Sequence, residues 1–291
     1  MKILFFGDVM FGRNNNYFVE NPFKFITKYI DKVDTIIFNL ETVISPKPII
    51  DNYKVDKVFN YQSNGIQLKY FNKYKEKDII ASITNNHSLD YDVYGFKKTK
   101  TFLKQNNILF SNKKYLETDE LIFLNYSDHC GCDDISYWRN HINILDYSNV
   151  EKLLEHIRKL KKKNKKIIFS IHWGANWLDS LPETMLEFGK KLIDNGVDIV
   201  FGHSAHHIPP KPYEIYKNKI IIYGLGDLIN DYAVDFKYKS NLALMCLIDF
   251  KKTKTKIELI TIDRTFVANG SSIPVPISSY TFSIPNINKN K

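Results

Sequence analysis

The hydrophobic positions of this chain form short apolar runs separated by longer segments with helical spacing. The runs are too short for helices and are rich in β-branched and aromatic residues, which favours buried strands. Strands that alternate with amphipathic segments predict an α/β fold. The predicted strands cover residues 3–6, 34–40, 78–83, 108–110, 121–125, 166–171, 197–202 and 219–223.

The segments between the runs carry helix signals. Leu153, Leu154, Ile157 and Leu160 form one apolar stripe, which is typical of a helix packed on a sheet. Asp90 stands where it would cap a helix that begins at Val93. The predicted helices cover residues 22–32, 64–74, 93–105, 150–162 and 182–195.

The C-terminal part of the chain has a different pattern. Residues 242–250 and 256–263 flank a lysine-rich turn and predict an antiparallel hairpin, which we assign to a second sheet. Ser, Pro and Asn dominate from Asn269 onward, which predicts an extended tail that packs partly on the surface. The sequence contains no long linker or repeat, so we expect one domain over residues 1–268 and an extended tail over 269–291.

Polar side chains with metal-binding chemistry follow five of the apolar runs. Each one alone could be a helix cap or a loop residue. Ligands of open α/β sheets collect at the carboxyl ends of strands, so side chains after separate strands can meet in one cavity. The coincidence at five strands therefore favours a shared site. The residues are Asp8, Glu41, Asn86 with His87, His172, and His203 with His206.

This donor set mixes carboxylate, amide and imidazole groups and contains no thiolate. Such a set suits manganese, iron or zinc better than magnesium. Two ions of this kind about 3.5 to 4 Å apart clamp the attacking and leaving oxygens of a phosphoryl displacement and supply hydroxide near neutral pH. We therefore predict two divalent metal ions and hydrolysis of a phosphoester.

The overall charge indicates the kind of partner. The formal net charge of +9 favours an anionic partner, either a phosphorylated compound or an acidic polymer. Much of this charge lies in residues 158–166, RKLKKKNKK, which we interpret as a solvated helix end. Nucleic-acid binding is the alternative for this run, and we do not expect a nucleic-acid partner.

Cysteine usage and the N-terminus bear on location. Three cysteines are too few for a disulfide framework, which fits a reducing compartment. Cys130 and Cys132 lack the second ligand pair of a structural zinc site, so we expect a flexible loop near the pocket mouth. The first apolar run is too short for a signal peptide, and no run reaches membrane-spanning length. We expect a cytoplasmic protein without a membrane anchor.

Six motifs occur in order along nearly the whole chain, and together they resemble one known family. They are GDVMFGR at 7–13, NLE at 39–41, NNH at 85–87 with Asp90, HWG at 172–174, GH at 202–203 with His206, and YGLGD at 223–227. In number and order they resemble the bacterial CapA family of capsule and poly-γ-glutamate synthesis, a branch of the calcineurin-like metallophosphoesterases.

This resemblance implies a fold and a set of site residues. The implied fold is a four-layer α/β/β/α sandwich like that of metallo-dependent phosphatases. His87 is implied near the leaving group, and Arg13 and Asn85 complete the candidate catalytic residues, with Arg13 attracting the anion. The implied metal ligands are Asp8, Glu41, Asn86, His172, His203 and His206.

The chain also departs from the family pattern. Metallophosphoesterases generally have a histidine two residues after the first Asp, where this chain has Met10, so occupancy by a single metal stays open. Ala175 replaces the usual glutamate after HWG, and Gly224 and Asp227 replace the usual Ser and Asn of the last motif. These changes leave the substrate open, and Asp227 either joins the site or only holds its turn.

Two functional hypotheses follow. The first is a divalent-metal-dependent phosphoesterase in capsule or exopolymer metabolism. The alternative is a component of capsule or poly-γ-glutamate synthesis that is either non-catalytic, with a vestigial metal site, or acts on an amide bond.

Overall fold

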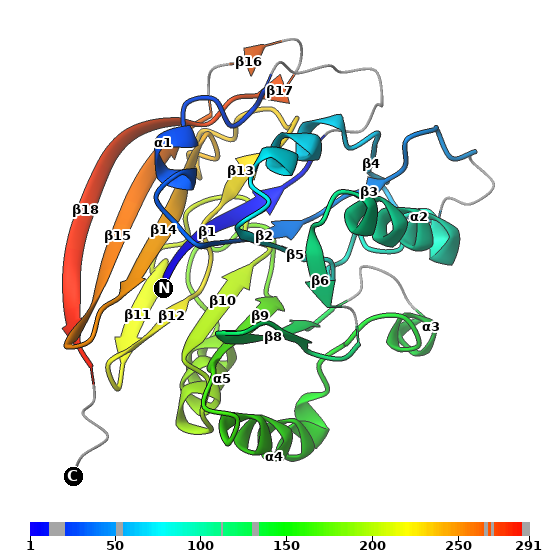
Figure 1. Ribbon diagram of the computed structural model, residues 1–291. Helices are drawn as coiled ribbons and strands as arrows, with labels where there is room; N and C mark the ends of the chain where they lie inside the picture. The colour runs from blue at the N-terminus through cyan, green and yellow to red at the C-terminus, as the bar shows by residue number, and fades with distance from the viewer. Residues whose placement is uncertain are drawn as a thin grey trace.

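The computed structural model describes residues 1–11, 21–50, 55–111, 113–129, 134–264, 267–268 and 271–286. The chain has a mixed α/β fold, as the sequence predicts, and its described residues build two main sheets (Figure 1). Arg13, Cys130 and Cys132 lie outside the described residues, so their predicted roles stay predictions.

The larger sheet contains the first strand of the chain at its centre. Strands β1, β2, β5 and β6 run parallel, and β14, β15 and β18 continue the sheet antiparallel on the other side of β1. β13 pairs with the end of β1. In sheet order the strands are β18 (Val275–Pro285), β15 (Lys254–Asp263), β14 (Leu242–Phe250), β1 (Lys2–Val9), β2 (Thr35–Leu40), β5 (Asp78–Ser82) and β6 (Leu109–Ser111), with β13 (Asp227–Ile229) beside β1.

The smaller sheet is mostly parallel. β8, β9, β10 and β12 run in one direction, and the short β7 and β11 close the two edges antiparallel. In sheet order the strands are β11 (Tyr213–Tyr216), β12 (Lys219–Ile222), β10 (Ile199–His203), β9 (Lys166–His172), β8 (Leu121–Ser127) and β7 (Leu116–Glu117). Two short pairs lie apart from both sheets, β3 (Val43–Ile44) with β4 (Gln62–Ser63) and β16 (Val267–Ala268) with β17 (Ser271–Ser272).

Helices pack on the two sheets on the sides that face away from each other (Figure 1). α1 (Thr27–Ile30), the 3₁₀ helix η2 (Ile66–Lys73) and α2 (Asp92–Gln105) lie against the larger sheet. α4 (Val150–Lys161) and α5 (Glu183–Asp194) cover the smaller one. The short α3 (Ile135–Arg139) and η3 (Tyr147–Asn149) lie in the connection after β8.

The facing sides of the two sheets share one hydrophobic core. Ile3 and Phe5 of β1 belong to the same buried cluster as Phe123, Ile168 and Phe201 from the smaller sheet. The ring centroids of Phe5 and Phe201 are 5.1 Å apart. Burial of one such side chain is worth roughly 1.5–3 kcal/mol, so this cluster fixes the two sheets against each other. The ends of β1 and β10 are thereby held close together.

The C-terminal hairpin was assigned wrongly to a second sheet. β14 pairs with β1 from Lys2 with Asp249 to Phe6 with Met245, so the hairpin continues the larger sheet. Its residues alternate between the two buried clusters, Met245 on the outer side and Cys246 on the inner side. A strand buried on both faces belongs inside a sheet, which explains the placement.

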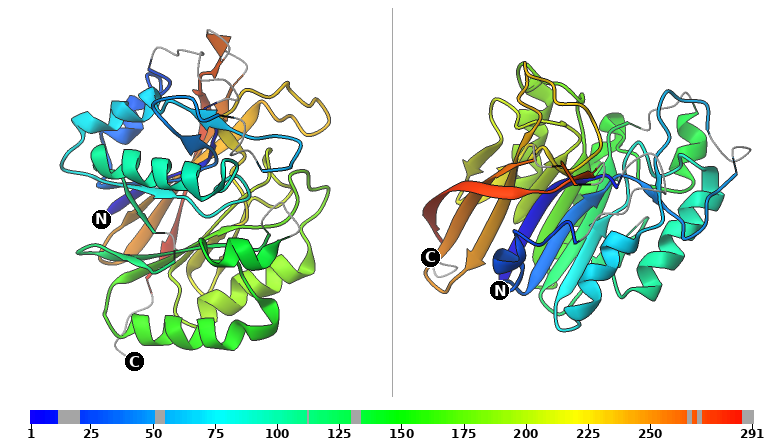
Figure 2. Two further views of the ribbon diagram at one scale, coloured as in Figure 1. Left: turned by 90° about the vertical axis from the view of Figure 1, so that its right-hand side faces the viewer. Right: turned by 90° about the horizontal axis from the view of Figure 1, so that it is seen from above.

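The chain beyond the hairpin forms a further strand in the region where an extended tail is predicted. β18 pairs with β15 along its length, from Lys254 with Pro285 to Asp263 with Val275. The right-hand view of Figure 2, in which the molecule is seen from above, shows the red β18 and the orange hairpin beside the blue β1. The division into a domain of residues 1–268 and a tail of 269–291 stays a prediction.

One local expectation was wrong for an identifiable reason. Asp90 does not cap α2, because Tyr91 occupies the cap position and the Asp90 carboxylate bonds inward to Lys57 and the Tyr61 N–H. Gly202 lies at a close approach between strands. A Cβ there would lie 2.4 Å from Trp173 Nε1, so the glycine permits close packing of neighbouring strands.

Among the described residues, no helix is both long enough and apolar enough to cross a membrane.

Candidate metal centre

The ends of three strands from the two sheets bring Asp8, His172 and His203 together. One ligand atom from each lies within 4.8 Å of the others, and all three side chains are buried. His172 and His203 are register partners in β9 and β10, and their Nδ1 atoms are 3.0 Å apart. Two buried imidazole nitrogens this close together can share a proton or a cation. We refer to these three residues as the first donor group.

A second donor group consists of Asp8, His206 and Asp227, again with ligand atoms within 4.8 Å of one another. His206 Nδ1 is 3.0 Å from Asp227 Oδ1. Asp227 stands opposite Asp8 in the pairing of β13 with β1. Gly7 makes this pairing possible, because a Cβ at that position would lie 1.8 Å from the Gly226 carbonyl oxygen. The two donor groups therefore share the Asp8 carboxylate.

The turn that follows β10 is shaped to fit Asp8. Ser204 has a φ of 115°, a conformation that residues other than glycine rarely adopt. Its backbone N–H donates to Asp8 Oδ2 at 3.2 Å. The turn lies between His203 and His206 in the chain, so the two histidines enter different donor groups. Such a backbone conformation costs of order 1–3 kcal/mol and is concentrated at functional sites.

Asn39 orients two of the predicted carboxylate ligands. Its Nδ2 donates to Asp8 Oδ1 at 2.9 Å and to Glu41 Oε2 at 3.0 Å. Asn85 Nδ2 in turn donates to Asn39 Oδ1 at 2.9 Å, and Asn85 Oδ1 accepts from the His87 N–H at 3.0 Å. Both ends of the Asn85 amide are therefore used to hold the loop in place. These contacts do not support the predicted catalytic role of Asn85.

Three buried polar atoms of the predicted ligands bear on whether a cation fits this centre. Glu41 Oε1, Asn86 Oδ1 and His172 Nε2 have no hydrogen-bond partner among the described residues. Leaving one such atom unsatisfied costs about 1–3 kcal/mol. Oxygen and imidazole atoms of this kind are donors that divalent metal ions bind. The residues present therefore fit a metal.

The electrostatics of the metal-free centre agree with this view. Burial, and then the Asp227 carboxylate, raise the pKa of Asp8 to about 7. Burial and the neighbouring Asp8 raise the pKa of Glu41 well above its ordinary value. Burial lowers the pKa of both His172 and His203 well below 6.5, so these rings are neutral. A neutral imidazole can bind a cation through its free nitrogen, and a carboxyl group that retains its proton can release that proton to a cation.

His206 behaves differently from the other two histidines. Burial acts to lower its pKa, but the Asp227 carboxylate and the bond to it outweigh burial, and the pKa of His206 is raised. Asn230 donates to Asp227 and accepts from the buried Arg264. This chain of contacts fixes Asp227. Sequence reasoning left Asp227 out of the ligand set, although its place in the YGLGD motif signalled it.

His87 lies beside the donor groups and is held from behind. Its Nδ1 is 2.7 Å from Asp90 Oδ2, and Lys57 Nζ donates to Asp90 Oδ1 at 2.8 Å and to the Asn86 carbonyl at 2.7 Å. His87 Nε2 is 3.8 Å from Glu41 Oε1. Burial lowers the pKa of His87 to about 4. The ring is therefore neutral, with Nδ1–H facing Asp90 and Nε2 facing Glu41. Lys57 was missed because its position in a polar connection gave no signal.

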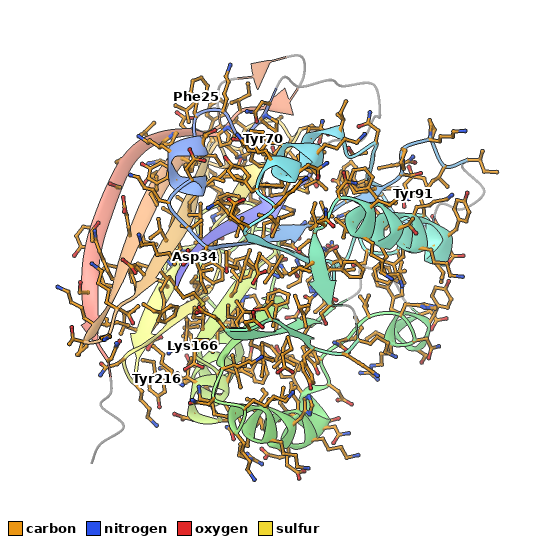
Figure 3. The ribbon with its side chains drawn as sticks, in the orientation of Figure 1. Phe25, Asp34, Tyr70, Tyr91, Lys166 and Tyr216 are labelled. Carbon is orange, nitrogen blue, oxygen red and sulfur yellow. The ribbon has the colours of Figure 1, made fainter. Side chains whose placement is uncertain are left out.

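A separate cavity of about 900 Å³ lies at the opposite ends of the strands. Lys166, labelled in Figure 3, lines it at the start of β9, together with Lys219 and Phe250. None of the predicted site residues lines this cavity. The donor geometry, and not the size of a cavity, therefore locates the candidate site.

These features define a mixed α/β protein with buried histidine and aspartate groups that could bind a metal. The family model described as "Bacterial capsule synthesis protein PGA_cap" matches residues 2–115 and 117–232. The chain belongs to this family, and the CapA resemblance seen in the motifs is confirmed.

The curated relatives include proteins named for polymer synthesis. The PGA biosynthesis protein CapA of Bacillus subtilis is 25% identical over 248 residues, which cover 78% of this chain and 62% of that protein. A probable polyglutamine synthesis accessory protein of Mycobacterium tuberculosis is 49% identical over 65 residues, 22% of this chain and 17% of that protein. The chain thus spans less than two thirds of the length of these relatives.

A solved structure also resembles this fold. The crystal structure of a hypothetical protein from Thermus thermophilus is 12% identical and covers 99% of this chain and 100% of that chain, with a TM-score of 0.48.

Replacing His203 and His206 together by alanine should abolish tight binding of a divalent metal, because one imidazole is lost from each donor group. Elemental analysis of the purified proteins measures this. His156→Ala, which removes an exposed histidine on α4, is the matched control and should keep its metal. Melting curves of the metal-free proteins show whether the double variant still folds. An unchanged metal content in a folded double variant would contradict the assignment.

Metal affinity should rise with pH up to at least about 7. Asp8 holds a proton below its raised pKa and must release it to bind a cation, so affinity falls by about tenfold per pH unit below that value for one proton. The raised pKa of His206 acts in the same direction, whereas His172 and His203 are already neutral. Calorimetric titration at pH 6 and pH 8, in buffers of different ionisation enthalpy, measures both affinity and proton release. Equal affinities at the two pH values would show that Asp8 is not a ligand.

Proposed function

We propose that this protein is a divalent-metal-dependent hydrolase of phosphoester bonds that acts in capsule or exopolymer metabolism. The observation that carries the proposal is the sharing of Asp8 by two donor groups. A carboxylate between two groups of ligands suits a pair of metal ions, which is the arrangement used for phosphoryl displacement.

We propose further that the fold is the four-layer α/β/β/α sandwich of metallo-dependent phosphatases. The hydrophobic cluster between the two sheets, and the clusters on their outer sides with helices, support this arrangement. The position of the donor groups at the carboxyl ends of β1, β9 and β10 also agrees with it.

The residues of this centre would have different roles. Asp8, His172 and His203 would hold one ion, and Asp8, His206 and Asp227 the other, with Glu41 and Asn86 as further donors. When bound, such ions supply hydroxide near neutral pH and neutralise charge on the reacting oxygens. Asn39 keeps the Asp8 and Glu41 carboxylates in place throughout.

His87 is the residue that would move a proton. Asp90 fixes Nδ1, so proton exchange with a substrate takes place at Nε2. Because the neutral ring carries its proton on Nδ1, Nε2 must first gain a proton before it can protonate a departing oxygen. General acid–base catalysis of this kind is worth roughly 10²- to 10⁴-fold in rate.

The substrate in this proposal is anionic, either a phosphorylated compound or an acidic polymer. The formal net charge of +9 attracts such a molecule from solution. Arg13 stays a candidate for anion binding, and a nucleic-acid substrate is not proposed.

A second candidate is a component of capsule or poly-γ-glutamate synthesis that either has no catalytic activity or acts on an amide bond. The names of the relatives favour it over phosphoester hydrolysis, because they link those proteins to polymer synthesis and name no phosphoester. The same donor groups would serve a metal-assisted attack on an amide carbonyl.

His87→Ala should retain its metal and lose far more rate on an alkyl phosphate than on an aryl phosphate with an acidic phenol. An alkoxide leaves poorly unless it is protonated, whereas the phenolate needs little help. Steady-state rates on the two compounds measure the difference. Equal losses on both would show that His87 accepts a proton or positions the substrate instead.

A substrate panel decides between the two candidates. It contains phosphate monoesters, phosphodiesters and oligo-γ-glutamate, each with manganese, iron or zinc. Turnover of an ester supports the phosphoesterase, and cleavage of oligo-γ-glutamate supports the amide-acting protein. Binding of metal without turnover of any compound supports the non-catalytic component.

Glu41→Gln should weaken metal binding and leave the fold intact, because the substitution keeps the shape of the side chain and removes its charge. Asn39→Ala should have a smaller effect, since Asn39 orients the ligands without being one. Metal titration and melting temperature measure the two properties. Normal metal affinity together with full activity in Glu41→Gln would exclude Glu41 as a ligand.

A further inference from the structure

Aromatic side chains line one side of the two donor groups. Tyr61 lies 4.2 Å from His87, measured between ring centroids. Tyr232 and Trp177 meet His206 edge-on, with centroids at 5.2 Å and 6.0 Å. The hydroxyl groups of Tyr61 and Tyr232 are in contact. These rings come from three distant segments of the chain, and they form a continuous wall from His87 outward to Trp177.

Trp177 is the exposed end of this wall. Its side chain is 37% exposed, whereas Trp138 and Trp173 are 2% and 1% exposed and belong to the core. An indole ring gains most from full burial, and an exposed one beside a candidate metal centre therefore needs an explanation.

The neighbours of Trp177 leave part of the ring free. His207 and Tyr238 lie nearly parallel to it, at 15° and 29°, with centroids 5.8 Å and 5.1 Å away. The centroids of His207 and Tyr238 are only 4.7 Å apart. Rings on opposite faces of an indole would be about 7 Å apart, since each contact separation is about 3.5 Å. Both rings therefore lie on the same side of Trp177.

Several contacts fix this arrangement. The Leu178 N–H donates to His207 Nε2 at 3.0 Å, and the His206 N–H donates to the Asn176 carbonyl at 3.0 Å. Lys237 and Asp179 form an ion pair of 2.9 Å that joins the Trp177 segment to the Tyr238 segment. The ring is thus held in place before any ligand arrives, which lowers the entropic cost of binding on it.

We propose that Trp177 is a stacking platform for the sugar ring of a hexose phosphate whose phosphate group is held at the donor groups. This inference rests on the proposed function and names its substrate class. The apolar C–H face of a pyranose packs on the π face of an indole, whose partial negative charge attracts those hydrogens. The centroid of the Trp177 ring lies 6.0 Å from that of His206. Tyr238, Asp179 and Lys237 surround it with groups that can bond sugar hydroxyls.

Trp177 also provides its own reporter, since the other two tryptophans are buried. With the metal-loaded full chain, hexose 6-phosphate should protect Trp177 fluorescence from acrylamide quenching. Glycerol phosphate and inorganic phosphate, which lack a ring, should not. Protection by phosphate alone would mean that metal-site occupancy moves the ring, and the platform would be wrong.

The kinetic test separates substrate binding from support of the metal site. Trp177→Ala should raise KM for hexose 6-phosphate roughly three- to tenfold with kcat unchanged, and should leave KM for glycerol phosphate unchanged. Trp177→Phe should recover part of the loss. Phe236→Ala is the matched control, because it removes an aromatic ring that is 88% exposed on the Tyr238 segment. Metal content must equal that of the wild type in each variant.

Each outcome decides one of the two proposals. An equal rise in KM for the ring-bearing and the acyclic ester would make Trp177 a support of the metal site and overturn the platform. A rise confined to an aryl phosphate would overturn the sugar class. Protection by hexose phosphate without turnover of any ester would retain the platform and reject the phosphoesterase. Turnover of an ester without protection of Trp177 would retain the phosphoesterase and reject the platform.

Discussion

The buried Asp8 carboxylate is the group on which the rest of the centre depends. It lies at the end of the central strand of the larger sheet, and it reaches His172 and His203 of the smaller sheet as well as Asp227 beside it. A carboxylate at this depth is unfavourable when ionised, which explains its raised pKa and the number of groups directed at it. The Asn39 amide and the Ser204 N–H both donate to it. The contact between Phe5 and Phe201 keeps the two sheets at the separation that this arrangement requires.

The strands and most of the candidate site could be predicted from the sequence because both depend on local patterns. An apolar run followed by a polar residue marks a buried strand end, and Asp8, His172 and His203 all follow such runs. Asp227 was not assigned because its position opposite Asp8 depends on the pairing of β13 with β1, which only the close approach at Gly7 permits. The role of Asp90 was missed for a similar reason. A carboxylate before a helix is an ordinary cap signal, and only the fold shows that Lys57 lies next to it.

The surroundings of His87 illustrate how a buried charge can serve a site without being a ligand. Lys57 and Asp90 form an ion pair of 2.8 Å with side chains that are 10% and 0% exposed. Removing charges from water is costly, and such pairs are weak contributors to stability. This pair instead fixes one nitrogen of the neighbouring imidazole and directs the other toward Glu41. Its role is better explained by the orientation of His87 than by a contribution to the free energy of unfolding.

The replacement of an expected histidine by Met10 changes the character of the centre more than the number of its ligands. Met10 is buried and apolar, and its backbone N–H bonds to the Ile229 carbonyl in the same β1–β13 connection that carries Asp227. The second donor group contains two carboxylates and one imidazole. If a metal binds there, a set this rich in anionic oxygen would suit a harder cation such as manganese better than zinc. Such a set would also leave a bound ion with less net positive charge to attract an anionic molecule. A neutral contact at the mouth of the site, such as an exposed aromatic ring, would then contribute a larger share of substrate affinity.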